Sequence, residues 1–127
     1  MKKILSLLGI MLMIYGTMNA QGKGKVVNVT GEVIETQCYI TGLTGPGKGI
    51  AHKECAIKSA KNGIPLAILE DKTGVVYLAG QTKKAQTGVN ELLLPLVAEK
   101  VDVTGRLYEK GGMKFLLISK VEKHGKK

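Results

Sequence analysis

One segment, from Val26 to Ile40, constrains the fold more than any other part of the chain. It is rich in Val, Ile and Thr, and its apolar residues fall at alternate positions, as in a β-strand with one buried face. The apolar positions change parity just after Gly31, from Val27 and Val29 to Ile34 and beyond. A one-residue slip at a glycine is typical of a β-bulge, so we expect a long strand that bends at Gly31.

The strand pattern recurs later in the chain. The sequence VNVTG at 27–31 is echoed by VDVTG at 101–105, which suggests a second strand that bends at a glycine, as strands in a small barrel must. Residues 64–70 and 74–79 read as one hairpin, and residues 99–109 and 113–123 as another. Five strands of this kind predict a mainly β fold, an OB-like five-stranded barrel, with an open β-sandwich as the alternative.

One helix is expected between the first strand and the rest of the barrel. Residues 41–50 contain four glycines and a proline and predict a loop. Residues 51–62 then carry a helical period that ends at Asn62 and Gly63. One face of this helix holds His52, Cys55, Ala56, Ser59 and Ala60, and we expect that face, with His52 and Cys55 in the first turn, to be turned toward the body of the protein.

The segment between the two hairpins carries weaker signals. Residues 80–89 are polar and predict a loop. Asn90 is expected to cap a short helical turn through Leu94, which Pro95 ends.

The N-terminus has the order of a secretory signal peptide. Two lysines precede an apolar run, and the mostly small or polar segment YGTMNA follows up to Ala20. We therefore expect a cleaved leader at residues 1–20 and a single OB-like domain at residues 21–127, exported to the periplasm or secreted. A permanent membrane anchor is the alternative, but the apolar run is shorter than the ~20 residues that span a bilayer, so we expect no stable membrane insertion after cleavage.

Charge and aromatic content indicate which class of molecule this protein binds. Loss of Lys2 and Lys3 with the leader lowers the net charge from +9 to +7. The remaining lysines are scattered, apart from Lys23 and Lys25 near the N-terminus and a basic C-terminal tail at residues 123–127. Few aromatic side chains are present to stack on bases. With export, this argues against nucleic acid and leaves an unidentified protein or small molecule as the expected partner.

The one chemically distinctive feature is the trio Cys38, His52 and Cys55. His52 and Cys55 lie three residues apart on the expected helix, and the glycine-rich loop could bring Cys38 over them from the end of the first strand. An oxidising compartment favours a Cys38–Cys55 disulfide, which would close a loop of about 17 residues and contribute on the order of 3 kcal/mol. The alternatives are a zinc or copper site with these three ligands, and two inert buried thiols.

Enzymatic patterns are missing from the sequence. It contains no C-x-x-C redox motif, no phosphate-binding loop, no G-x-S-x-G and no paired carboxylates with catalytic spacing. His52 and Cys55 have no evident orienting Asp or Asn, as a nucleophilic pair would need. We therefore expect a non-enzymatic protein without a resident cofactor, unless the trio binds copper or zinc.

The stretches TQCYI at 36–40, GKGIAHKECA at 47–56 and NGIPLA at 62–67 carry a resemblance. They are similar to a group of small exported bacterial proteins of unknown activity, in which C-Y, a glycine-rich loop, H-x-x-C-A-x-x-C, G-x-P, G-V-Y and a final V-x-G hairpin follow in order. The resemblance spans nearly all of residues 21–127 and implies export and this fold. The group's second helical cysteine falls at Ser59 here. If the group binds metal through three cysteines and a histidine, this chain lacks one ligand.

The sequence therefore favours an exported, non-enzymatic binding or structural module held by a Cys38–Cys55 disulfide. The alternative is a periplasmic copper- or zinc-binding protein with Cys38, His52 and Cys55 as its ligands.

Overall fold

Five strands close into a barrel in the computed structural model, which describes residues 24–82 and 88–126. The barrel order is β1-β2-β3-β5-β4, with β1 paired to both β2 and β4 and with β3 and β5 parallel. The mainly β, OB-like prediction is confirmed. In chain order the elements are β1 (Lys25–Glu35), α1 (Thr36–Thr41), the 3-10 turn η1 (Ile50–His52), α2 (Lys53–Lys61), β2 (Leu66–Glu70), β3 (Val76–Gln81), α3 (Asn90–Leu93), the 3-10 turn η2 (Leu94–Leu96), β4 (Lys100–Lys110) and β5 (Met113–Lys123).

The first strand closes the barrel because it changes neighbours along its length. Its residues from Lys25 to Glu32 pair with β4, and those from Gly31 to Glu35 pair with β2. A Cβ atom on Gly31 would lie only 2.2 Å from the Leu69 carbonyl oxygen. The missing side chain therefore lets β1 and β2 approach closely where the two pairings overlap.

The predicted bulge at Gly31 is wrong, because both ladders of β1 run through that residue without a register shift. Val29, Gly31 and Val33 all point into the barrel with one unbroken alternation. Ile34 is buried on the opposite face, in a second small apolar cluster with Ala67 and Leu69. The apparent change of parity thus reflects a strand end that is buried on both faces.

The bulge lies instead in the last hairpin. Thr104 pairs with Lys120, whereas Gly105 pairs with Ile118, so Ser119 is the extra residue of β5. A Cβ on Gly105 would lie 2.6 Å from the Leu117 carbonyl oxygen, and the Ser119 hydroxyl donates to the Thr104 carbonyl at 3.1 Å. The irregularity thus lies opposite Gly105, but the extra residue belongs to β5, and a bend of the 101–105 strand at its own glycine stays a prediction.

The strand predicted to reach residue 40 ends at Glu35, and residues 36–41 form the helix α1 instead. The buried Glu35 carboxylate caps this helix by accepting the backbone N–H groups of Gln37 and Cys38, at 2.7 and 2.8 Å. Thr36 is held at the same point, because its backbone N–H and its hydroxyl both donate to the Pro65 carbonyl. These contacts outweigh the strand propensity of the local sequence.

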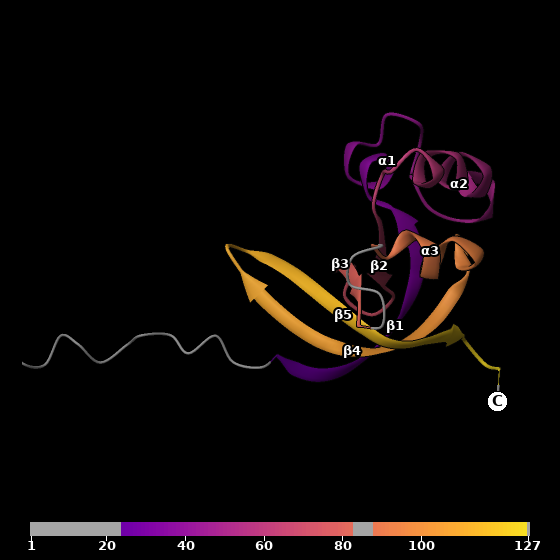
Figure 1. Cartoon of the computed structure of the whole chain (residues 1–127). Helices are drawn as coiled ribbons and strands as arrows, with labels where there is room; N and C mark the ends of the chain where they lie inside the picture. Colours follow the sequence, from indigo (N-terminus) through magenta and orange to yellow (C-terminus); the bar gives the residue numbers. More distant parts are fainter. Residues whose placement is uncertain (1–23, 83–87, 127) are drawn as a thin grey trace, which may run out of the picture.

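The helix expected at 51–62 is present as η1 followed by α2, and both hairpins are present with the predicted pairing. Figure 1 shows α1 and α2 together at one end of the barrel, above the strands in this view. Ala56 and Ala60 of α2 pack into the main core with Leu93 of α3. The candidate site therefore lies at this end, where the chain between β1 and β2 covers the barrel.

Asn90 does not cap the turn that follows it. Its side chain accepts from the Leu66 N–H at 2.9 Å and donates to the carbonyls of Ala60 and Ile64 at 3.1 and 2.8 Å. It therefore joins the end of α2 to the start of β2. The short helix is as expected, although Pro95 lies inside the 3-10 turn η2 that extends it. The predicted leader at residues 1–20 and part of the predicted 80–89 loop lie outside the described residues.

Candidate metal centre

Cys38 is placed by the capping of α1. As the third residue after Glu35, it presents its backbone N–H to the capping carboxylate, and its side chain is only 8% exposed. The prediction that Cys38 ends a strand is therefore wrong. The helical turn places its thiol within 4.8 Å of the donor atoms of His52 and Cys55, which follow the next loop.

The glycine-rich loop returns directly onto α1. A Cβ on Gly47 would lie 2.5 Å from both the backbone nitrogen and the Cα of Tyr39, so only glycine permits this contact, and its φ of +65° also favours glycine. Two residues later, the Gly49 N–H donates to the Glu32 carboxylate on β1. The loop is thereby held against both α1 and the barrel just before the chain reaches His52.

His52 ends the 3-10 turn η1 and is 8% exposed. Its backbone N–H donates to the Gly49 carbonyl at 3.0 Å, but its imidazole makes no hydrogen bond within residues 24–82 and 88–126, and its Nε2 atom is fully buried. The space that His52 shares with β1 and the loop has no room for a water molecule. A buried polar group without a partner costs about 1–3 kcal/mol, so the imidazole is unsatisfied in this state.

Cys55 lies in the first turn of α2, on its exposed side. The predicted common face is thus divided: His52, Ala56 and Ala60 are buried, Ser59 is half-buried and Cys55 is exposed. The expectation that His52 and Cys55 both face the protein body holds only for His52. Cys55 instead gives the site one ligand that solvent can reach.

The structure brings the three predicted residues together. Their donor atoms, two sulfurs and one imidazole nitrogen, all lie within 4.8 Å of one another. Ligands bound to one ion at about 2.3 Å are separated by about 3.8–4.0 Å, so a small closure would place all three on a common metal. Among the described residues, no other His, Cys, Asp or Glu joins this group.

The favoured Cys38–Cys55 disulfide is not formed. Both cysteines are free thiols, the first buried and the second exposed. The two sulfurs and a histidine nitrogen instead lie within 4.8 Å of one another as three separate donors. The interpretation of two inert buried thiols also fails for Cys55, because that side chain is exposed.

The surroundings of Cys38 oppose a free thiolate. Hydrogen bonding to the Glu35 carboxylate is the largest cause that raises the pKa of the Cys38 thiol. Burial, the Glu35 charge and the nearby Cys55 raise this pKa further, whereas hydrogen bonding to Thr44 lowers it. Two neighbouring thiolates repel each other when no cation lies between them. The site as it stands therefore holds Cys38 as a thiol, which a metal ion would have to deprotonate.

Glu35 and Gly47 are the residues of this site that sequence reasoning missed. Glutamate is an uncommon N-cap, so Glu35 before a β-rich stretch gives little sign of capping a helix. Gly47 is one of four glycines in its loop, and sequence does not show which of them touches another segment. Both act by positioning the ligands.

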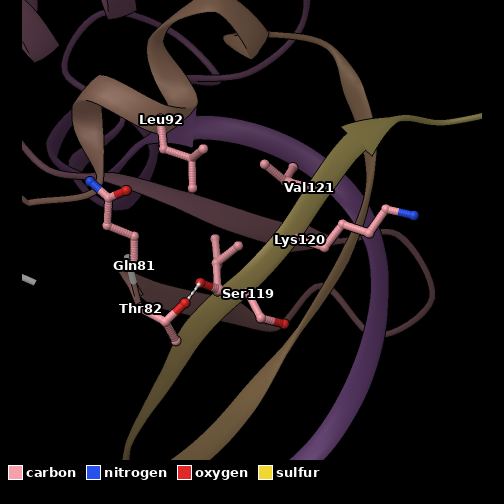
Figure 2. A pocket seen from close by; sticks show the side chains of 7 residues that line it. Gln81, Thr82, Leu92, Ser119, Lys120 and Val121 are labelled. Carbon is pink, nitrogen blue, oxygen red and sulfur yellow. Dashed lines mark hydrogen bonds between the residues drawn. The ribbon is translucent and has the colours of Figure 1, made fainter. Parts of the chain in front are cut away.

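Outside this site, the structure has a cavity of about 240 Å³ beside β3, α3 and β5 (Figure 2). In the figure the Thr82 hydroxyl donates to the Ile118 carbonyl, at 3.3 Å. The volume is below the ~300 Å³ at which small-molecule sites usually begin, and the lining holds one charged side chain, Lys120. This cavity is a weaker candidate for a ligand than the Cys–His–Cys cluster.

No helix within the described residues is long and apolar enough to cross a membrane. No protein-family model, curated protein or solved structure matched this chain. The cluster therefore has to be interpreted from its own geometry.

Proposed function

We propose that this is an exported protein that binds one thiophilic metal ion, Cu(I) or Zn²⁺, through Cys38, His52 and Cys55. The observation that carries the proposal is the convergence of three soft or borderline donors within 4.8 Å. One of them belongs to an imidazole that is buried without a hydrogen-bond partner among the described residues. Thiolate and imidazole are the donors that both ions prefer.

Metal binding would satisfy the cluster in ways that the protein alone does not. It would give the His52 ring a partner and would separate two thiolates by a positive charge. It would also occupy both sulfurs, which otherwise face oxidation in an exported protein. The barrel, α1 and the glycine-rich loop would serve as the scaffold that holds the ligands in place.

Native mass spectrometry on protein purified without chelator tests this proposal. We expect one ion per chain, seen as a mass increase of about 60 units that acid removes. His52→Ala should lose the ion. The matched control is His124→Ala, because His124 is the second of two histidines in the chain and pairs with Asp102 away from the cluster.

Two outcomes would contradict the proposal. One is a wild-type protein that takes up neither Cu(I) nor Zn²⁺ even when the reduced chain is supplied with each ion. The other is a His52→Ala variant that loads as fully as His124→Ala. A mass about two units below that of the reduced chain would mean that the cysteines are oxidised, and it would likewise count against a metal site.

Export is tested separately by cell fractionation and by sequencing the N-terminus of the mature protein. We expect the leader to be removed after Ala20, so that the mature chain begins at Gln21. A full-length chain retained in the cytoplasm would refute export and would leave the metal-binding test unaffected.

A further inference from the structure

The number and type of the ligands also indicate which ion the site binds. We infer that the Cys38, His52 and Cys55 site is a three-coordinate site that selects Cu(I) over Zn²⁺. This inference rests on the proposed metal binding, and it concerns which ion the same three residues bind.

The number of ligands is the first reason. Structural zinc sites are almost always closed by four protein ligands in a tetrahedron, and the described residues provide three. Cu(I) is a soft d¹⁰ ion that thiolates select, and three donors around it in a plane are sufficient. Zn²⁺ bound here would have to recruit water or another external ligand on the exposed Cys55 side.

The Glu35 carboxylate beside Cys38 is held in place by the cap of α1. Glu35 is fully buried, and its two oxygens accept the backbone N–H groups of Gln37 and Cys38 at 2.7 and 2.8 Å. Turning this carboxylate toward a metal would leave both N–H groups without partners and would uncap α1. Glu35 therefore acts as a positioning residue for Cys38, and the group of donor atoms in the described residues contains no carboxylate oxygen.

Spacing and position are compatible with a planar Cu(I) site. With metal–sulfur bonds of about 2.3 Å, ligands lie about 4.0 Å apart in a planar trigonal site and about 3.8 Å apart in a tetrahedron. The donors start within 4.8 Å of one another, so a planar site needs each pair to close by no more than about 0.8 Å. Two thiolates around Cu(I) leave one net negative charge, and solvent at the exposed Cys55 screens part of it.

A substitution at position 59 can add a fourth ligand to the site. Ser59 follows Cys55 by one helical turn in α2 and is half-buried, so Ser59→Cys would add a fourth soft donor on the adjacent turn. If the natural site is complete with three ligands, this change should raise the affinity for Zn²⁺ by about tenfold or more and alter the affinity for Cu(I) far less.

The experiment uses the full reduced chain under anaerobic conditions, wild type beside Ser59→Cys. Each protein is titrated with Cu(I) and with Zn²⁺ against a chromophoric competitor for that ion, and the Cu(I) complex is measured by X-ray absorption. We expect one Cu(I) per chain with two sulfur ligands and one nitrogen ligand. We also expect weak zinc binding by the wild type that Ser59→Cys strengthens.

Each other result has a distinct meaning. A four-coordinate wild-type zinc complex as tight as that of Ser59→Cys would overturn the three-coordinate inference and leave the metal-binding proposal intact. A Cu(I) complex with a fourth protein ligand would do the same. Failure of the wild type to bind either ion would overturn both.

Discussion

Replacing Gly47 by alanine should separate the ligands of the site without touching any of them. The added Cβ would lie 2.5 Å from the backbone of Tyr39 and 2.6 Å from the carbonyl carbon of Cys38. Ordinary carbon contacts lie at about 3.5–4.0 Å, so the loop would have to move outward by about 1 Å. Because α1 is fixed by its cap and the loop leads into His52, this movement draws His52 away from Cys38.

Gly45→Ala is the matched control. Gly45 lies in the same loop with a φ of +100°, and a Cβ there would meet nothing within 4 Å. It should therefore lose only the backbone term, about 1–2 kcal/mol for a non-glycine residue at positive φ. Gly47→Ala should lose this term together with about 1–3 kcal/mol for the forced contact, which makes about 2–5 kcal/mol in all.

Urea denaturation of the metal-free chains gives the stability difference, and competitive titration gives the metal affinity. We expect Gly47→Ala to bind the ion about tenfold more weakly than Gly45→Ala, because the ligand positions depend on the Gly47 contact. If the two variants lose equal stability and bind metal equally well, Gly47 does not hold the loop to α1, and this account of how the site is assembled is wrong.

Three further predictions concern positions that other contacts make important. Glu35→Gln should destabilise the fold by about 1–3 kcal/mol and lower the pKa of the Cys38 thiol. Iodoacetamide should therefore label Cys38 faster at a given pH, and slower labelling would refute the role of the Glu35 charge. A hydrogen bond from Thr30 and contact with His124 lower the pKa of Asp102. The stabilisation from Asp102 is therefore present above its unfolded pKa of about 3.9 and is lost as the pH falls through the lower folded pKa. The melting temperature of the wild type should drop more steeply below pH 4 than that of Asp102→Asn. Asn90→Ala should cost about 1–3 kcal/mol in urea denaturation, because three backbone groups lose their partner, and a loss below 0.5 kcal/mol would contradict the tie between α2 and β2.

Local pattern was sufficient for most of the barrel. Apolar alternation and glycine turns placed the two hairpins, and helical spacing placed His52 and Cys55 in one turn. The same signals failed at the end of β1, where Ile34 is buried on the outer face and the chain enters a helix at Thr36. A strand that is buried on both faces loses its period of two, so periodicity there cannot show which face is inside.

The sequence by itself determined the fold class and the three residues with metal-binding chemistry. Only the tertiary structure decided how they meet. The Glu35 cap places Cys38 in a helix, the Gly47 contact closes the loop, and His52 is buried without a partner among the described residues. Fold class follows from the spacing of apolar residues, which repeats over many neighbouring positions. The state of the cysteines depends on a few ångströms between segments that are far apart in the chain, and no local pattern encodes such distances.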